Sequence, residues 1–438
     1  MDKLAPILYK SYGTYCNKQK MLPNIIDGTL PVQKRVLLGC HTWAKNWLKT
    51  NAVLGQVMAA WHPHSEALGT AEQLVQNGFV DGSGLWGTRE GIEPIGCAAM
   101  RYTKLKANKF IEDMAFKYID HVKWEEDEMD PEPVYIPTMI PFCLMQKYEL
   151  SMIGFGFKTE IPCYKRSDLI KRLLFLMNIG PRIDIIPHVD GCIVGNGDYI
   201  DILTKGSGKI SVQGLHKVDK VKKIIEVKGW STRTSFPTLL GKIDKYKKWN
   251  LLSNNDIAFI DQTGNGGNTN IIFEVSKQRN VDTIFKKMVE AITESLNTVH
   301  SYNMYVVDEN SNVVMAGVDE MLIKAFNHYK LAFESYLNDT TLKLNSQINE
   351  YEIINNIRPH ISDAIATSGN DIEKSIEYLV LKTSLNADDI KSVMEKYRIK
   401  RLLSISIDIQ KLKDEVIYLA DQLKNSNQVC IDSYGSLI

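Results

Sequence analysis

The sequence of 438 residues lacks the features that mark a membrane, secreted or zinc-binding protein. No apolar run reaches the roughly 18 residues of a membrane-spanning helix, and the first residues do not resemble a signal peptide. The seven cysteines are scattered and include no CxxC pair, which argues against a disulfide framework and a zinc site. We therefore expect a soluble, cytoplasmic protein with no membrane partner.

The sequence also lacks a net charge and a nucleotide-binding loop. Lys plus Arg and Asp plus Glu both number 52, so the formal net charge is zero. Basic residues nevertheless outnumber acidic ones by about two to one over residues 158–250. Such a local excess is typical of a phosphate-contacting surface, and also of a solvated surface balanced by acids elsewhere. No GxxxxGK[ST] segment occurs, which excludes a Walker phosphate loop.

What the sequence does contain is an arginine directly before a tyrosine, at the end of a run of small residues. Arg101 and Tyr102 lie in the segment GCAAMRYT, residues 96–103. A tyrosine hydroxyl is a poor nucleophile at neutral pH, with an unperturbed pKa of about 10. Its attack on a phosphodiester requires neighbouring cations and usually a metal ion. Arg101 is one such cation, although the pair alone equally fits a half-buried surface contact.

Five further segments stand in order around this one. They read LPNIIDG followed by PVQKR (residues 22–35), WHPH (61–64), VDGSGLWGT (80–88), IPTMIP (136–141), and GFG followed by TEIP (154–162). Their order and spacing resemble those of the DNA-cleaving polypeptide of type IIA topoisomerases, the gyrase A and topoisomerase IV A family. The resemblance extends over nearly the whole chain.

The resemblance implies a set of catalytic residues. Tyr102 is expected to attack a backbone phosphate and form a 5′-phosphotyrosyl bond, so that resealing needs no high-energy cofactor. Arg101 and Arg35 are expected to contact that phosphate and to stabilise its charge. His62 and His64 match the family's two histidines near the cleaved strand and are expected to donate to phosphate oxygens. A His-x-His pair also occurs in metal sites, but no third ligand stands nearby in sequence.

The resemblance also implies DNA contacts elsewhere. Lys20 and Lys34 stand where the family usually has arginines, so they keep the charge without the bidentate fork. Ile161 matches the family's intercalating isoleucine, an apolar wedge that unstacks a base step. An Ile-Pro dipeptide is otherwise common in protein cores. The segment TKGSGKI, which contains Lys205 and Lys209, resembles a DNA-contacting turn of the family's tower domain, and an ordinary lysine-bearing hairpin has the same pattern.

The fold class expected from the resemblance is mixed α and β, with several domains. Residues 1–145 show helical apolar spacing over Gln33–Leu48 and Glu66–Gln76, which predicts a helix pair before a hairpin. This plan fits a winged-helix DNA-cleavage domain, one of several options that the residues alone leave open. Residues 146–312 contain strand-like runs between glycine-rich turns, which fit the family's α/β tower domain. The runs cover residues 209–212, 223–227 and 270–275.

Residues 313–438 are expected to be helical. Mostly apolar residues recur in steps of three and four over residues 322–340 and again over residues 402–423. The two series predict an antiparallel coiled coil with a helical globule between its helices. In the resembled family that globule is the gate through which the protein dimerises. A helical bundle without a gating role has the same heptads.

The expected partners follow from what the family divides between polypeptides. Its magnesium-binding acids and its ATPase lie on another polypeptide or domain, so Mg²⁺ and ATP are expected on a separate ATPase subunit of the TOPRIM type. Two copies of each polypeptide are expected to act on double-stranded DNA. The acidic run at residues 125–130 is interpreted as a solvated loop without a catalytic role.

The chain ends soon after the second heptad series, which leaves no room for a DNA-wrapping propeller. Relaxation and decatenation are therefore expected rather than active negative supercoiling. The compact organisation most resembles that of the medium subunit of T-even phage topoisomerases, which implies a viral source and action in the host cytoplasm or nucleoid.

Two other functions stay open. A non-catalytic DNA-binding or decoy subunit is supported by departures from the family motifs at Leu30, Ser65-Glu66 and Leu85-Trp86. A tyrosine recombinase needs a scattered Arg-His-Arg set and no coiled-coil gate, so the family motifs argue against it. Ala67 and Ala71 replace the serine and the acid that help gyrases to hold quinolones, which predicts weak quinolone sensitivity.

Overall fold

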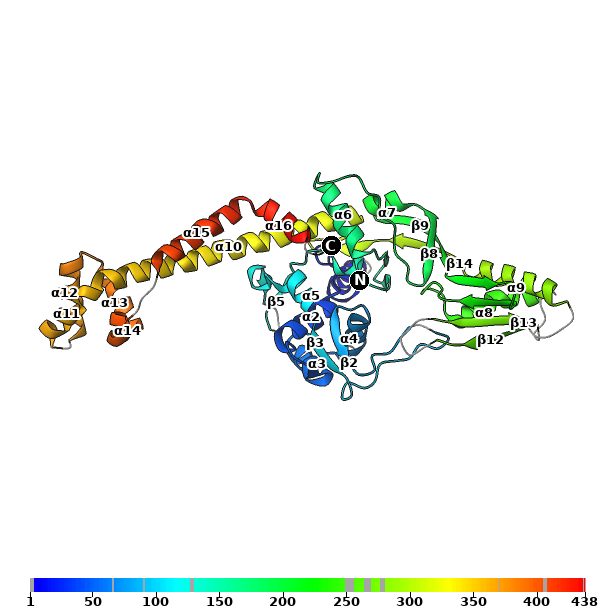
Figure 1. The fold of residues 1–438 in the computed structure, drawn as a ribbon, viewed down its shortest axis with the longest axis horizontal. Helices are drawn as coiled ribbons and strands as arrows, with labels where there is room; N and C mark the ends of the chain where they lie inside the picture. Colours follow the sequence, from blue (N-terminus) through cyan, green and yellow to red (C-terminus); the bar gives the residue numbers. More distant parts are fainter. Residues whose placement is uncertain are drawn as a thin grey trace. The chain divides into compact units, whose positions relative to one another are not determined.

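The computed structural model of the chain describes residues 4–64, 67–89, 91–126, 130–248, 256–263, 269–275, 280–369, 371–404, 408–435 and 437. The chain forms two compact units, Met1–Tyr329 with Tyr434–Ile438, and Lys330–Ser433. Helices and antiparallel sheets both occur, so the fold is mixed α and β (Figure 1). No helix in the described ranges combines the length and apolar character that crossing a membrane requires.

The first part of the larger unit combines three helices with a small antiparallel sheet. The helices are α2 (Pro31–Trp43), α3 (Thr50–Ala60) and α4 (Ala67–Gln76). The strands are β1 (Leu48–Lys49), β2 (Val80–Ser83) and β3 (Lys104–Ala107), in the order β1-β3-β2. Their shared core is apolar and fully buried, as Val36, Val57 and Leu105 show. This core fixes the frame from which the loop between β2 and β3 projects.

The helix predicted over Gln33–Leu48 is wrong at its C-terminal end. The observed helix α2 ends at Trp43, because Leu48 and Lys49 are extended and pair with β3. Pairing across the sheet overrides an apolar spacing that continues to Leu48. The helix predicted over Glu66–Gln76 is confirmed as α4, with Glu66 itself outside the described residues. Helix α3 was not predicted.

Short elements connect this frame to the rest of the unit. They are α1 (Leu4–Cys16), η1 (Asn17–Met21), α5 (Lys109–Ile111), η2 (Glu112–Phe116), η3 (Ile119–His121), β4 (Trp124–Glu125), β5 (Glu132–Pro133) and η4 (Phe142–Leu144). Strands β4 and β5 form a two-stranded hairpin, which places Glu132 close to α2.

Two antiparallel sheets follow. The five-stranded sheet has the order β6-β7-β14-β9-β8, with β6 (Leu150–Ile153), β7 (Lys158–Ile161), β8 (Cys192–Gly197), β9 (Ser207–Gly214) and β14 (Asn297–Asn303). The four-stranded sheet has the order β10-β11-β13-β12, with β10 (His216–Asp219), β11 (Ile224–Val227), β12 (Ile257–Asp261) and β13 (Ile271–Val275). The three predicted strands are confirmed as β9, β11 and β13, although β11 and β13 each begin one residue later than predicted.

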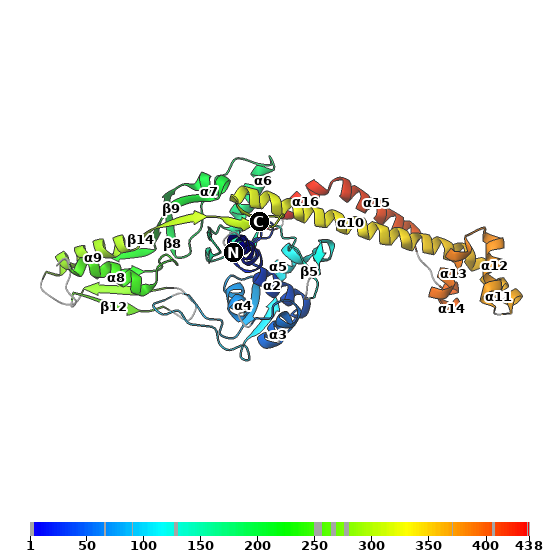
Figure 2. The same cartoon turned by 180° about the vertical axis from the view of Figure 1, so that it is seen from behind.

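Helices and a further hairpin accompany these sheets. They are α6 (Arg166–Leu176), α7 (Tyr199–Lys205), α8 (Phe236–Lys248), α9 (Val281–Ser295), β15 (Tyr305–Val307) and β16 (Val313–Met315). Helices α8 and α9 lie along the four-stranded sheet (Figure 2). Together with it they enclose a buried apolar cluster that includes Phe273, Met288 and Ile292.

The smaller unit is helical. Helix α10 (Val318–Ile357) enters it at Lys330 and is followed by η5 (Arg358–His360), α11 (Ile361–Ser368), α12 (Ile372–Thr383), α13 (Ala387–Lys396), α14 (Ile399–Ser404), α15 (Ile409–Lys424) and α16 (Ser426–Gly435). The end of α10 and helices α11 to α14 share one apolar core, to which Ile357, Leu379 and Leu402 contribute. This core forms the globule between the two heptad series.

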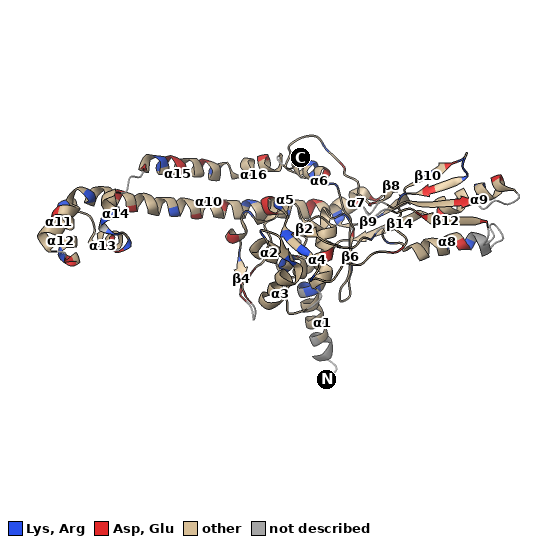
Figure 3. Cartoon of the chain, turned by 60° about the horizontal axis from the view of Figure 1, so that its bottom comes forward, with Lys and Arg blue, Asp and Glu red and all other residues tan. Residues whose placement is uncertain are grey.

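Helix α15 runs beside α10 in the opposite direction (Figures 1 and 2). Lys413 near its start forms an ion pair of 2.7 Å with Glu352, whereas Ser426, just after its end, donates to Glu334. Within α15 the heptad positions are the less exposed ones, and Leu419 is buried. Basic and acidic residues are interspersed along both helices (Figure 3).

The prediction of one uninterrupted heptad helix over residues 402–423 is wrong. Leu402 lies on α14 and is buried in the core of the globule. Helix α15 begins only at Ile409, where Asp408 caps it by accepting a hydrogen bond from the backbone N–H of Lys411. Ile405 lies outside the described residues. An N-cap aspartate one residue before the apolar spacing resumes is the sequence signal that marks this start.

Candidate active site

Tyr102 lies at the end of the long loop between β2 and β3, two residues before β3. Its side chain is 66% exposed, so the hydroxyl can be reached from solvent. The guanidinium carbon of Arg101 lies 4.7 Å from the centre of the Tyr102 ring. The two residues that are adjacent in sequence are therefore also in contact as side chains.

The backbone on both sides of Tyr102 is fixed to the start of α3. Thr103 is buried, and its carbonyl oxygen accepts a hydrogen bond of 3.1 Å from the N–H of Thr50. The hydroxyls of Thr50 and Thr103 lie 2.7 Å apart. Lys49 donates from Nζ to the carbonyl oxygen of Arg101 at 2.9 Å. These bonds hold the main chain of Tyr102 while leaving its side chain exposed.

The VDGSG segment explains how the chain after β2 approaches the backbone of Tyr102 so closely. Gly84 has a φ of +100°, which L-residues rarely adopt. A Cβ atom at this position would lie 2.9 Å from the carbonyl oxygen of Tyr102. Both facts require glycine, so this motif shapes the backbone of the site rather than supplying a reactive group.

Arg35 and Lys34 lie on α2 and are both engaged by Glu132 of β5. Arg35 donates to the two carboxylate oxygens of Glu132 at 3.1 and 2.8 Å. Lys34 lies 3.4 Å from the same carboxylate and donates to the carbonyl oxygen of Pro133. Burial acts to raise the pKa of Glu132, but the hydrogen bond from Arg35 and the two positive charges outweigh it, so the pKa lies below its usual range.

This acid was missed in the sequence. Glu132 follows the acidic run at residues 125–130, of which residues 127–129 lie outside the described part of the chain. With Lys34, Arg35 and Lys18 it lines a cavity of about 290 Å³. The only signal in the sequence was the position of Glu132 just after a cluster of acids, in a chain whose basic residues were expected to bind phosphate.

His62 and His64 follow the C-terminus of α3. Their ring centres lie 5.2 Å apart, and the backbone N–H of His64 donates to the carbonyl oxygen of His62 at 2.7 Å. His62 is partly buried and His64 is exposed. Over the described residues, no group of three or more His, Cys, Asp or Glu side chains is arranged to hold a metal ion.

The residues expected to bind DNA lie on separate elements. Lys20 is exposed on η1, Lys205 ends α7 in an ion pair of 2.8 Å with Asp201, and Lys209 is exposed on β9. Part of the local basic excess lies on the turn after β10, which is blue at the end of that strand in Figure 3. Lys205 thus lies on a helix next to the five-stranded sheet, and Lys209 lies on that sheet. Neither is on the frame that carries Tyr102.

Ile161 is completely buried at the end of β7, where it lies opposite Leu150. Intercalation needs a side chain that reaches the surface. In this conformation Ile161 is a core residue, and its intercalating role stays a prediction.

Comparison with known proteins decides the family. A family model that describes the A polypeptide of DNA gyrase and topoisomerase IV matches residues 20–434. The chain belongs to this family. It is 24% identical over 476 aligned positions to the gyrase A protein of Brachyspira hyodysenteriae, covering 96% of this chain and 54% of that relative.

A second relative is the topoisomerase 4 A protein of Bacillus subtilis, which is 23% identical and covers 95% of this chain and 54% of its own length. The gyrase A protein of Neisseria gonorrhoeae is 28% identical over 49% of this chain and 25% of its own. The chain spans about half the length of the first two relatives. The family resemblance inferred from the motifs is confirmed.

Within this gyrase/topoisomerase IV A chain, two of the motifs meet through one buried carboxylate. Asp27 accepts hydrogen bonds from the N–H and hydroxyl of Thr29 at 2.8 and 2.7 Å, and from the N–H of Ile136 at 2.8 Å. Burial raises its pKa despite these bonds. The LPNIIDG and IPTMIP segments are therefore joined in the core, and Asp27 has a structural role.

Proposed function

We propose that this chain is the DNA-cleaving and rejoining subunit of an ATP-dependent type IIA topoisomerase. It makes a transient double-strand break through 5′-phosphotyrosyl links and lets a second duplex pass through the break. The observation that carries the proposal is the exposed Tyr102 side chain in contact with the Arg101 guanidinium, in a member of the gyrase/topoisomerase IV A family.

The chemistry follows from the positions of these two side chains. The Tyr102 hydroxyl gives up its proton to water as its oxygen attacks the phosphorus, the bond from phosphorus to the 3′ oxygen breaks, and that oxygen takes up a proton from water. Arg101 offsets the charge that builds on the non-bridging oxygens. The reverse reaction restores the phosphodiester, and the bond energy is conserved throughout. Mg²⁺, held mainly by a partner subunit, supplies further stabilisation of that charge.

The remaining basic residues are assigned to binding. His62 and His64 donate to phosphate oxygens next to the cleaved bond. Arg35 contacts the cleaved phosphate and Lys34 the backbone beside it, once the DNA competes with Glu132 for their donors. Three further lysines contact the DNA backbone at a distance from Tyr102, namely Lys20, Lys205 and Lys209.

The domain assignment supports this division of labour. A winged-helix domain over residues 1–145 carries Tyr102, a tower domain over residues 146–312 extends the DNA surface, and residues 313–438 form a coiled coil with a dimerisation gate. The helices α2 to α4 with their three-stranded sheet support the first assignment. The antiparallel pair α10 and α15 with a globule between them supports the third.

The working enzyme is proposed to contain two copies of this chain and two copies of a separate ATPase subunit of the TOPRIM type. Each copy of Tyr102 cleaves one strand. The expected outcome is relaxation and decatenation without active negative supercoiling. A phage source is proposed as well, with action in the cytoplasm or nucleoid of the host cell.

A tyrosine exchange tests the proposal. Tyr102→Phe removes the nucleophile, and Tyr418→Phe is a matched control because that side chain is 60% exposed. Both variants are assembled with the ATPase subunit from the same source and assayed for decatenation, for cleavage of an end-labelled duplex and for DNA affinity. Tyr102→Phe is expected to abolish decatenation and cleavage while DNA affinity is kept, and Tyr418→Phe to behave as the wild type.

A wild-type complex that binds DNA without cleaving it contradicts the proposal and favours the non-catalytic DNA-binding subunit. Cleavage that persists in Tyr102→Phe contradicts the assignment of the nucleophile.

A further inference from the structure

The loop between β2 and β3 contains a narrow hairpin, which ends shortly before Tyr102. At its base, the N–H of Ala98 donates to the carbonyl oxygen of Leu85 at 3.0 Å. Midway, Thr88 and Ile95 exchange two backbone hydrogen bonds of 2.8 and 2.9 Å. Tyr102 follows four residues after the base. We call residues 85–98 the nucleophile hairpin; its residue 90 lies outside the described residues.

The tip of the nucleophile hairpin docks on the four-stranded sheet. Ile92 packs against the buried apolar cluster formed by that sheet with α8 and α9. The backbone of Ile92 also donates a hydrogen bond to the carboxylate of Asp261 at the end of β12. Beside it, Gly91 is buried, and a Cβ atom there would lie 3.3 Å from the methyl group of Thr263. The tip therefore makes apolar, polar and close backbone contacts with one sheet edge.

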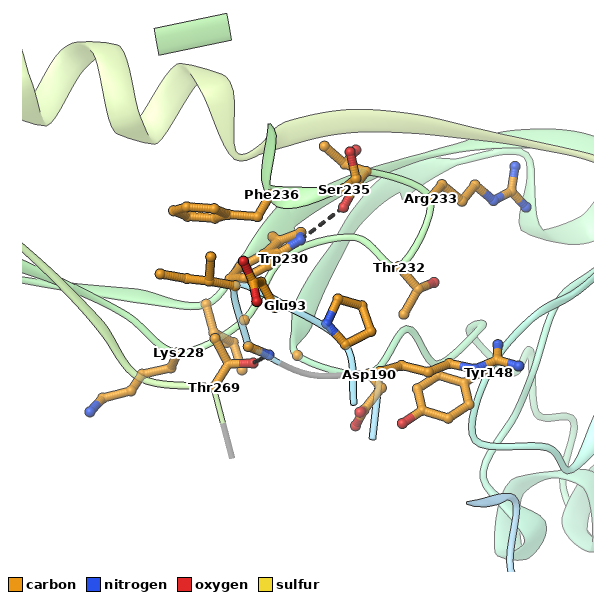
Figure 4. A pocket seen from close by; sticks show the side chains of 18 of the residues that line it. Glu93, Tyr148, Asp190, Lys228, Trp230, Thr232, Arg233, Ser235, Phe236 and Thr269 are labelled. Atoms are coloured by element: carbon orange, nitrogen blue, oxygen red, sulfur yellow. Dashed lines mark hydrogen bonds between the residues drawn. The ribbon is translucent and has the colours of Figure 1, made fainter. Parts of the chain in front are cut away.

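Between tip and base, the hairpin borders open space. It forms one wall of a cavity of about 1050 Å³. Figure 4 shows Lys228 and Thr269 on one side of this cavity and Tyr148 and Asp190 on the other, with Glu93 from the hairpin between them. Across this space the guanidinium carbon of Arg89 lies 5.0 Å from the centre of the Tyr148 ring. The orientation of the hairpin therefore depends on its base, on this exposed cation–π contact and on the docked tip.

We propose that Ile92 is a positioning residue for Tyr102. Its docking fixes the tip of the hairpin, the backbone pairing carries that constraint to Ala98, and the chain then reaches Tyr102 four residues later. A hairpin that loses the apolar part of its tip anchor can pivot further about its base, and displacing a reacting group by about 1 Å can reduce a rate by about a hundredfold. The inference rests on the proposed role of Tyr102 and adds a coupling between the nucleophile and the four-stranded sheet.

A matched pair of isoleucines on the same hairpin provides the test. Ile92→Ala removes the docked side chain, and Ile92→Val retains most of it. Ile95→Ala is the control, because that side chain is 50% exposed and its pairing with Thr88 uses only backbone atoms. Each variant is assembled with Mg²⁺ and the ATPase subunit, and the single-turnover rate of covalent DNA cleavage is measured together with the DNA Kd and the melting temperature.

Ile92→Ala is expected to slow cleavage by about tenfold, equivalent to about 1.4 kcal/mol, at an unchanged DNA Kd and with little change in melting temperature. Ile92→Val and Ile95→Ala are expected to stay within about twofold of the wild type. Hydrogen exchange supplies a second measurement that does not depend on turnover. Residues 96–102 are expected to exchange faster in Ile92→Ala and to be unchanged in Ile95→Ala.

The outcomes separate this inference from the proposed function. A wild-type complex that forms no adduct overturns both. The positioning role alone is overturned if the wild type cleaves through Tyr102 and Ile92→Ala matches it in two measurements. These are the rate of cleavage and the protection of residues 96–102 from hydrogen exchange. Equal losses of rate in Ile92→Ala and Ile95→Ala also overturn it, because a general loosening of the hairpin then explains the effect.

Discussion

Removal of the Arg101 side chain is the substitution whose effect on the cleavage rate can best be worked out from the structure. Its guanidinium carbon lies 4.7 Å from the Tyr102 ring centre. We take a similar separation, about 5 Å, between the guanidinium and the charge that builds on the attacked phosphate; two unit charges at that distance interact by about 0.8 kcal/mol in bulk water and by about 3 kcal/mol at an effective dielectric constant of about 20. In the proposed complex, DNA covers the site and excludes water, which favours the larger value. Since about 1.4 kcal/mol corresponds to a tenfold change in rate, Arg101→Ala is expected to slow cleavage by about a hundredfold.

The assay is single-turnover cleavage of an end-labelled duplex by the assembled complex at saturating DNA, so that weaker binding does not contribute. Arg101→Lys keeps a point charge without the planar fork and is expected to fall between the wild type and Arg101→Ala. A rate for Arg101→Ala within about threefold of the wild type, at the bulk-water end of the Coulomb range, refutes the reasoning.

Three further predictions concern Glu132, Ile161 and the response to quinolones. Because the folded pKa of Glu132 is depressed, its stabilisation is present above the usual carboxyl pKa and is lost as pH falls through the folded value. Glu132→Gln should therefore lower the unfolding free energy by about 1–2 kcal/mol at pH 7 and by much less near pH 3. An equal loss at the two pH values refutes this prediction. Ile161→Ala should cost about 2–4 kcal/mol in urea unfolding without DNA, since the side chain is fully buried; no loss contradicts a core role. Ala67 and Ala71 are buried and offer no polar group, so quinolones should trap few cleavage complexes, and strong trapping at ordinary doses contradicts this.

The sequence predicted the parts of the fold that depend on local pattern. Helix α4 and strands β9, β11 and β13 follow from apolar spacing and glycine-rich turns, and the heptad face of α15 is indeed its less exposed face. The contact between Arg101 and Tyr102 could also be predicted, because residues that are adjacent in sequence are necessarily close. Each of these features is set by neighbours along the chain.

The features that sequence reasoning missed depend on distant partners. Helix α2 ends at Trp43 because Leu48 and Lys49 pair with a strand that lies more than fifty residues later. Glu132 engages Arg35 across an even larger separation, and Ile92 docks on a sheet that the chain forms much later. Local periodicity carries no information on such pairings, since they are fixed by tertiary packing.

The most direct test of the account is to identify the residue to which cleaved DNA becomes attached. The wild-type complex with Mg²⁺ and its ATPase subunit is mixed with duplex DNA and denatured, and the protein–DNA adduct is digested and mapped by mass spectrometry. The account predicts a 5′ phosphate linked to Tyr102, formed only when the partner and metal are both present. An adduct on another residue, or none from a complex shown to be assembled on DNA, contradicts it.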